Sequence, residues 1–298
     1  MIKINNVSKS YGKFFAVKNV NIEIEEGMIY GLIGENGSGK TTLFKCVTGI
    51  YKCNEGNVLI DGEDVYENAE VKAKIGYVAD SNEYFPGYRL GKMVEFYKGI
   101  YKEFDVERFK ELNQIFNLDM NKKVRELSKG QKMRLAFMLN IAAKPKVLVL
   151  DEPTSGLDAM AKKELFDVLI DEVEKNKITV LISSHNLSDI ERICDDISII
   201  KNGSTEGHDG LKKVMSMARK FQIVFENGAP EGFFNNEKII SYTNVGSIYT
   251  VIFNQFTDDD IEKIKKYRPS FMEEINLNLE EIFVCTKGGE AYASNGIS

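Results

Sequence analysis

The segment from Gly34 to Thr42 constrains the fold of this chain more than any other. Its sequence, GENGSGKTT, fits the pattern G-x-x-x-x-G-K-[ST] at every fixed position. Three glycines within six residues let the backbone turn tightly, so that successive N–H groups point inward at an anion. The apolar run 29–33 predicts a buried strand before the loop, and residues 40–47 predict a helix after it. The sequence therefore predicts a phosphate-binding loop at a helix N-terminus.

This loop predicts a nucleotide site. Lys40 can reach the β- and γ-phosphates, and the Thr41 hydroxyl can bind Mg²⁺. The alternative, a plain glycine-rich turn, is disfavoured because a chance match to four fixed positions has odds of about one in a hundred. The residues expected to hold the nucleotide are Gly34, Glu35, Asn36, Gly37, Ser38, Gly39, Lys40, Thr41 and Thr42.

Length and charge limit the classes of protein to consider. The 298 residues suffice for one large or two moderate domains with a buried core. The net charge of −6 argues against broad nucleic-acid binding, so we expect no nucleic-acid partner. No apolar run approaches the roughly 18–20 residues of a membrane helix, and the N-terminus lacks the apolar block of a signal peptide. We therefore expect a cytoplasmic protein that acts on a membrane only through another polypeptide.

Cysteines and histidines predict no metal centre. The four cysteines lack metal-ligand spacing and suggest reduced cytosolic thiols that fill the core. The two histidines are too few and too far apart for a metal site. These residues are Cys46, Cys53, Cys194, Cys285, His185 and His208.

Hydrophobic patterning predicts an α/β fold in the first two thirds of the chain. Residues 2–7, 14–20 and 21–25 alternate like antiparallel strands, whereas residues 89–143 have helical spacing. Two buried-strand patterns follow, at 147–150 and 179–183, with a helical segment between them. Alternating buried strands and helices favour a parallel sheet with both faces covered.

The pattern changes after Gly203. Strand patterns occur at 221–225 and 249–253, and capping-box patterns begin at Thr257 and Asn278. We expect residues 219–298 to form a small C-terminal α/β accessory domain.

Four further motifs lie downstream of the phosphate loop in a fixed order. Together they resemble the ABC-type ATPases over about residues 1–205. In chain order they resemble the LSGGQ signature, the Walker B strand, the D-loop and the switch histidine, and they are LSKGQ (127–131), VLVLDE (147–152), SGLD (155–158) and SSH (183–185). The resemblance implies a P-loop NTPase core at 1–218, with an antiparallel β subdomain and a helical subdomain at about 83–145. It also implies ATP and Mg²⁺ as cofactors.

Within this resemblance, chemical roles can be assigned around the γ-phosphate. Asp151 ends a buried strand and can hold the Mg²⁺ that Thr41 also binds. Glu152 points elsewhere along the strand and is the candidate to position and deprotonate the attacking water. His185 is expected to contact the γ-phosphate, as the family's switch histidine does.

The resemblance also implies that two ATPase subunits sandwich two nucleotides. Ser128 stands where a helix N-cap belongs, with Gly130 beside it, and this helix start is expected to bind the ATP of the opposing subunit. Whether that subunit is an identical or a different chain stays open. Tyr11 matches the aromatic residue that stacks on adenine in this family.

Asp80 departs from the family's pattern. Many members carry a Gln at this position that approaches Mg²⁺ and the attacking water. The sequence Asp80-Ser81-Asn82 resembles a turn that would carry the Asp80 side chain away from the phosphates. We therefore expect Asp80 to face the membrane partner.

Three classes of ABC protein compete. The favoured one is the ATPase subunit of a bacterial exporter of drugs, antibiotics or antimicrobial peptides, peripheral on the membrane and driving a separate permease by ATP-dependent dimer closure. The similarity is strongest to Ytr-type ATPases; import remains a rival direction. Translation-associated members carry two ATPase units. Repair ATPases carry long heptad arms between the phosphate loop and the signature motif, and the roughly 85 residues between these motifs here leave no room for such arms.

Five aromatic residues either form the groove for the permease or belong to the core of the helical subdomain: Tyr84, Phe85, Tyr88, Phe96 and Tyr97.

Overall fold

The computed structural model describes residues 1–82, 84–206, 218–278 and 281. The chain divides into two compact units, Met1–His208 and Asp209–Ser298, and each is described by itself. Within the described ranges, no helix combines the length and the apolar character needed to cross a bilayer. Cys285 and His208 lie outside the described residues, whereas Cys46, Cys53 and Cys194 are free thiols.

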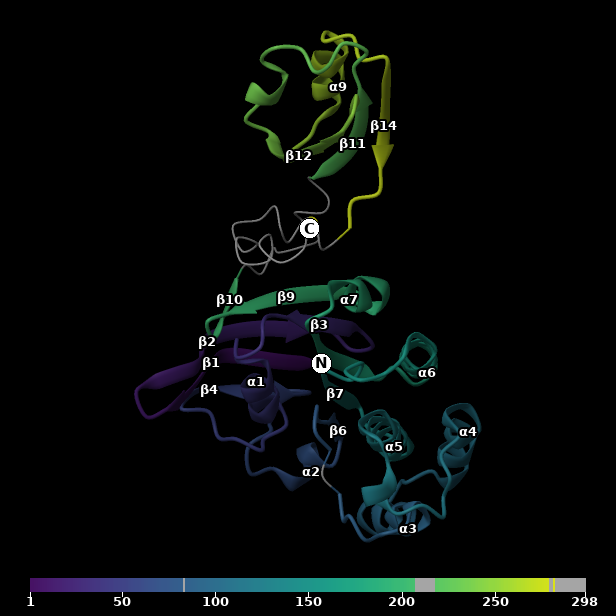
Figure 1. The fold of residues 1–298 in the computed structure, drawn as a ribbon. Coiled ribbons are helices and arrows are strands. Elements are labelled where there is room, and N and C mark those ends of the chain that lie inside the picture. Colours follow the sequence, from purple (N-terminus) through teal and green to yellow (C-terminus); the bar gives the residue numbers. More distant parts are fainter. Residues whose placement is uncertain (83, 207–217, 279–280, 282–298) are drawn as a thin grey trace. The chain divides into compact units, whose positions relative to one another are not determined.

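An antiparallel sheet opens the first unit (Figure 1). Its strands, in spatial order, are β2 (Phe14–Ile24), β1 (Ile2–Tyr11), β4 (Glu55–Ile60) and β5 (Glu63–Asp64). The sequence predicted two strands where β2 is one. Asn19 adopts a left-handed conformation (φ 49°) and the β1–β2 register shifts nearby, so an irregularity absorbs the break in alternation while pairing continues.

A six-stranded sheet forms the centre of this unit. In spatial order it contains β10 (Ser204–Glu206), β9 (Asp196–Lys201), β3 (Ile29–Ile33), β8 (Thr179–Ser184), β7 (Val147–Asp151) and β6 (Ile75–Val78). The pairings from β9 to β6 are parallel, and β10 adds an antiparallel edge. The predicted parallel sheet is confirmed. Because strands β3, β7 and β8 are parallel and in register, their carboxyl ends meet at one edge, with Ile33 opposite Ser184 and Asp151 opposite Ser183.

Helices cover this sheet. In chain order they are α1 (Lys40–Val47), α2 (Ala69–Lys72), α3 (Leu90–Ile100), α4 (Val106–Phe116), the 3₁₀ turn η1 (Val124–Glu126), α5 (Lys129–Ala142), α6 (Ala159–Asn176) and α7 (Leu187–Ile193). The helical pattern predicted over residues 89–143 therefore resolves into α3, α4, η1 and α5, which group together beyond β6 (Figure 1). The Asn117 residue, with a left-handed φ of 50°, ends α4.

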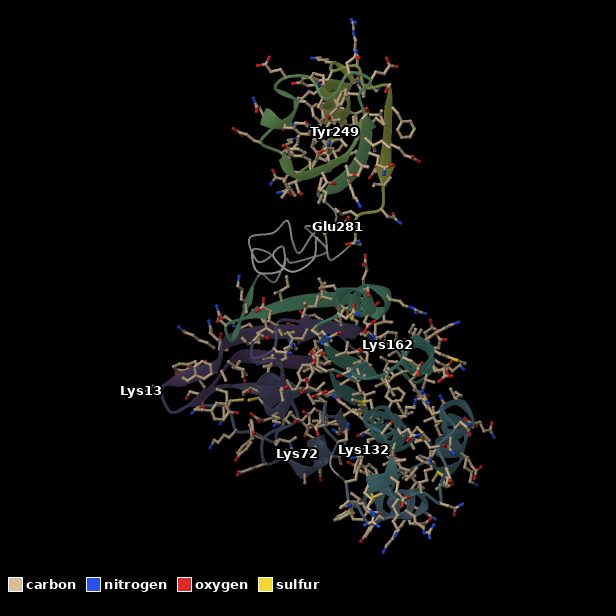
Figure 2. The ribbon with its side chains drawn as sticks, viewed as in Figure 1. Lys13, Lys72, Lys132, Lys162, Tyr249 and Glu281 are labelled. Carbon is tan, nitrogen blue, oxygen red and sulfur yellow. The ribbon has the colours of Figure 1, made fainter. Side chains whose placement is uncertain are left out.

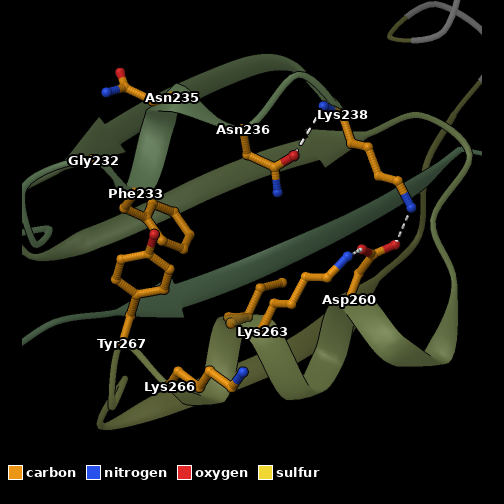
Figure 3. A pocket seen from close by; sticks show the side chains of 10 residues that line it. Gly232, Phe233, Asn235, Asn236, Lys238, Asp260, Lys263, Lys266 and Tyr267 are labelled. Atoms are coloured by element: carbon orange, nitrogen blue, oxygen red, sulfur yellow. Dashed lines mark hydrogen bonds and ion pairs between the residues drawn. The ribbon is translucent and has the colours of Figure 1, made fainter.

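Among the described residues 218–278, the second unit contains a four-stranded antiparallel sheet with the helix α9 (Asp258–Lys265) against it (Figure 3). Its elements are β11 (Arg219–Val224), η2 (Phe233–Asn235), β12 (Ile239–Val245), β13 (Ile248–Phe253), α9 (Asp258–Lys265) and β14 (Phe271–Ile275), with the sheet order β12-β13-β11-β14. A buried cluster that includes Phe221, Phe253 and Ile264 joins helix to sheet.

Both capping boxes predicted in this unit are confirmed. Asp260 Oδ2 accepts hydrogen bonds from the backbone N–H and the hydroxyl of Thr257. Asn278 and Glu281 exchange backbone-to-side-chain hydrogen bonds. Burial acts to raise the pKa of Asp260, but hydrogen bonds, first among them that of Lys238, outweigh it and hold the pKa well below its usual range. Figure 3 shows Lys238 and Lys263 pointing at this carboxylate from opposite sides.

Candidate active site

The phosphate loop joins the end of β3 to the start of α1, as predicted. Gly37 and Gly39 adopt left-handed conformations with φ of 83° and 111°, which a residue with a Cβ adopts only at a cost. A Cβ at Gly39 would also collide with the Ala16 carbonyl, and one at Gly34 would lie 2.5 Å from the Ile200 carbonyl oxygen. Gly39 is therefore required by both backbone conformation and packing, Gly37 by conformation and Gly34 by packing.

Lys40 folds back over this loop. Its ammonium donates hydrogen bonds to the carbonyls of Gly34 (2.5 Å) and Glu35 (3.2 Å) and lies 3.3 Å from Glu152 Oε1. The side chain is 6% exposed. A nearly buried ammonium at the mouth of a loop of inward N–H groups makes an anion site, because both elements attract phosphate oxygens.

Asp151 lies at the carboxyl end of β7, where its neighbour on β8 is Ser183. The Ser183 hydroxyl donates to Asp151 Oδ1 (2.8 Å) and accepts from the Glu152 N–H (3.0 Å). Burial raises the pKa of Asp151 above its ordinary value, although the nearby hydroxyls of Thr41 and Ser183 act to lower it. Asp151 Oδ2 is buried without a hydrogen-bond partner. An orphaned carboxylate oxygen beside a Thr hydroxyl fits an oxygen-seeking cation such as Mg²⁺.

Glu152 is positioned by an uncommon backbone conformation. Its φ is 52°, in the left-handed region, just where β7 ends. Its Oε2 lies 2.6 Å from Nδ1 of His185 and accepts the His185 backbone N–H at 3.2 Å. The carboxylate thus connects Lys40 of the loop to His185 after β8, and the structure brings these three predicted residues together.

A cavity of about 330 Å³ opens over the loop. Its lining includes most of the predicted nucleotide residues: Tyr11, Glu35, Asn36, Gly37, Gly39, Lys40, Thr41, Thr42 and Glu152. Gly34 and Ser38 complete the loop beneath it, and the Ser38 hydroxyl is buried without a partner. Tyr11 is half-exposed and meets Tyr51 edge-on, with ring centroids 6.3 Å apart. Phe14 and Ala16 also line the cavity, although the sequence analysis did not single them out.

Ser128 and Gly130 do not line this cavity. Ser128 caps α5, since its exposed hydroxyl accepts the Gln131 N–H at 3.2 Å, and Gln131 Oε1 accepts the Ser128 N–H at 3.1 Å. The predicted N-cap is confirmed. A Cβ at Gly130 would lie 3.1 Å from Leu157, so this helix start packs closely on the turn 155–157.

The expected orientation of Asp80 is wrong. The turn forms, because the Asn82 side chain bonds both the N–H and the carbonyl of Ala79. The Asp80 side chain nevertheless lines the nucleotide cavity. Its carboxylate forms an ion pair of 2.7 Å with Lys129, which also donates to Ser155 at 3.1 Å. The sequence of the turn alone could not show that Asp80 pairs with a lysine 49 positions away.

The sequence reasoning also missed the part played by Ser183. It quoted this serine only as a member of a motif. The pairing of Ser183 with Asp151 depends on the register of β7 and β8, so it can be recognised only once these two strands are aligned.

Comparison with known proteins identifies the family of this chain. Residues 17–155 match the family model described as ABC transporter. The chain is 32% identical to the ABC transporter ATP-binding protein YtrB of Bacillus subtilis, over 97% of this chain and 99% of that protein. It is 32% identical to the lantibiotic transport ATP-binding protein SrtF of Streptococcus pyogenes (76% and 99%) and 33% identical to the methionine import ATP-binding protein MetN of Clostridioides difficile (68% and 66%).

Solved structures agree with the sequence relatives. The dimeric post-hydrolysis structure of the ATP-binding cassette MJ0796 bound to ADP and Pi has a TM-score of 0.64 and 28% identity, and it covers 70% of this chain and 97% of that one. The fold of an ATP-hydrolysing cassette therefore holds three features here: a phosphate loop, a buried carboxylate, and a second carboxylate beside a histidine. This chain belongs to the ATP-binding subunits of ABC transporters, which are ATPases.

Proposed function

We propose that this ATPase drives a separate transmembrane permease, and that it exports drugs, antibiotics or antimicrobial peptides. The observation that carries this proposal is the match to a lantibiotic transport subunit over 76% of this chain. The match to YtrB extends over nearly the whole chain and includes the second unit. An import subunit matches over only 68% of this chain. The protein would then act in the cytoplasm, held peripherally at the membrane by its permease.

The chemistry follows from the site. Lys40 and the loop N–H groups hold the β- and γ-phosphates of ATP. Thr41 and the free Oδ2 of Asp151 would hold Mg²⁺, which neutralises phosphate charge. Glu152 positions the attacking water and accepts its proton, and His185 fixes the orientation of that carboxylate through the 2.6 Å contact. Tyr11, half-exposed at the cavity rim, stacks on adenine.

Ser128 and Gly130 act on a second subunit. They lie at the N-terminus of α5 and outside the cavity of their own chain, and a helix N-terminus attracts phosphate. Two ATPase subunits that face each other would complete each other's sites, so ATP would close the dimer. A dimeric cassette with bound ADP and phosphate supports this arrangement.

The helical region 83–145 provides the surface for the permease. Phe85 and Phe96 are exposed, and their rings meet edge-on at 5.2 Å. Phe85 also stacks on Tyr88, with centroids 4.8 Å apart. Exposed aromatic side chains already packed together lose little conformational freedom on binding and suit an anchor. The unit that follows residue 218 serves as an accessory domain for assembly or regulation.

The decisive experiment is co-purification followed by transport. The tagged chain should retain an integral membrane protein after mild detergent extraction, and Phe85→Ser/Phe96→Ser should release it while ATP binding persists. In cells, loss of the chain should raise sensitivity to the exported antibiotic or peptide. Uptake of a nutrient that depends on the chain would instead establish import, and a ribosome or DNA partner would establish a non-transport ATPase.

A further inference from the structure

The lining of the cavity over the phosphate loop carries three carboxylates and one ammonium. Among its lining residues, the charged ones are Glu35, Asp80, Glu152 and Lys40. Lys40 and His185 already contact Glu152. Asp80 is the carboxylate whose counter-charge comes from outside the lining, from Lys129 at 2.7 Å. A triphosphate that enters this cavity meets Asp80 at close range, and like charges repel.

Lys129 is held in place by the turn that follows β7. Its ammonium donates to Ser155 Oγ at 3.1 Å, and its Cδ would lie 3.7 Å from a Cβ at Gly156. The neighbouring Gly130 packs on the same turn, with no space to spare for a side chain. The lysine stem therefore lies along residues 155–156, and its half-exposed ammonium contacts both Asp80 and Ser155.

These contacts join three segments that are distant in sequence. Asp80 follows β6, Lys129 begins α5 and Ser155 follows β7. The first of them lines the nucleotide cavity, whereas the other two lie beside the helix start that Ser128 caps. The ion pair is thus the direct polar link from this cavity to the start of α5 within the described residues of one subunit.

We propose that Lys129 is a positioning residue for nucleotide binding in its own subunit: it neutralises Asp80 and holds that carboxylate at the cavity edge. The inference rests on the proposed nucleotide site but goes beyond it, since Lys129 touches no phosphate in this role. Nucleotide affinity then depends on a lysine outside the phosphate loop, and the dependence disappears when Asp80 loses its charge.

A double-mutant cycle on the full chain tests this. ATP binding is measured by calorimetry in EDTA at about 50 mM salt, where screening is weak and no added cation masks the carboxylate. Lys129→Met should weaken binding about tenfold, since it leaves Asp80 unpaired beside the phosphates. Asp80→Asn should bind as well as the wild type or better. Asp80→Asn/Lys129→Met should return to within about twofold of the wild type.

Two controls make the result specific. Lys132 lies on the same helix (Figure 2) and makes no ion pair in the described structure, so Lys132→Met should bind as the wild type does. Raising the salt to about 0.5 M should shrink the Lys129→Met effect at least threefold. Lys40→Ala should abolish binding in every background; if it does not, the nucleotide site itself is misassigned, whatever Lys129 does.

The proposal is overturned by any of three outcomes. Wild-type affinity in Lys129→Met shows that Asp80 needs no counter-charge. A double variant as weak as Lys129→Met shows that the lysine binds phosphate directly. Equal losses in Lys132→Met and Lys129→Met show a general effect of helix charge.

Discussion

Replacing Ser183 by Ala removes a single hydroxyl group, yet it should strongly destabilise the centre of the active site. The Ser183 side chain is fully buried and joins Asp151, the last residue of β7, to Glu152, which follows it. Its hydroxyl donates to the carboxylate of Asp151 and accepts from the backbone of Glu152. Alanine removes both hydrogen bonds.

The magnitude follows from the two bonds. A hydrogen bond to a charged group contributes about 1.5–3 kcal/mol, and an orphaned buried N–H costs about 1–3 kcal/mol. We expect a loss of about 3 kcal/mol in the local free energy of opening, since the turn after Glu152 can relax partly. Ser184 is the matched control: it is equally buried on the same strand, but its hydroxyl accepts only the Asn186 N–H. Ser184→Ala should cost about 1 kcal/mol.

Hydrogen exchange measured on peptides that cover β7 and β8 is the appropriate assay. The chain has two compact units, so one global unfolding curve would mix them. A 3 kcal/mol loss speeds exchange about 150-fold, and a 1 kcal/mol loss about fivefold. Equal acceleration in the two variants would refute the reasoning, because it would show that the contact with Asp151 adds nothing to the burial of a serine.

Four further outcomes are expected. Glu152→Gln should lower the ATPase rate at least about 100-fold while ATP binding stays intact, and the variant should elute as an ATP-bound dimer on gel filtration; near-wild-type turnover would remove Glu152 from the role of base. Lys40→Ala should lose nucleotide affinity itself, measured by calorimetry. Asp151→Asn should raise the thermal midpoint of the Mg²⁺-free protein at pH 7, because burial raises the Asp151 pKa and the charged carboxylate therefore lowers stability as the pH rises above 3.8. The difference in midpoint between variant and wild type should shrink toward about pH 4. A difference that stays constant with pH would contradict this prediction. Removal of residues 219–298 should leave a folded protein that binds ATP, and a truncated protein that is folded by circular dichroism yet binds none would show that the accessory unit belongs to the site.

The residues of the phosphate loop could be predicted because local sequence fixes their geometry. Gly37 and Gly39 need left-handed backbone, and Lys40 begins a helix that any chain with this loop must form. The strands β3 and β7 are short apolar runs that end at the loop and at Asp151, so the sequence also located the edge where they meet. Local chemistry and global fold agree at these positions.

The ion pair of Asp80 with Lys129 could not be predicted in the same way. The turn at 80–82 determines the direction of the backbone. The Asp80 side chain, however, pairs with the positive charge of Lys129, which belongs to another motif. The sequence analysis included Lys129 only as a member of the motif LSKGQ. Pairings between segments about 50 residues apart depend on how α5 packs against the turn after β7, which no periodicity in the sequence reports.

The two departures from the family's pattern compensate each other. A glutamine at position 80 would be neutral, and a glycine at position 129 would carry no charge. This chain instead has a carboxylate at the first position and an ammonium at the second, and the structure places them 2.7 Å apart. Substituting either alone leaves a charge beside a site that already holds Asp151, Glu152 and Lys40. Substituting both keeps the local charge balance, so the pair behaves as one unit.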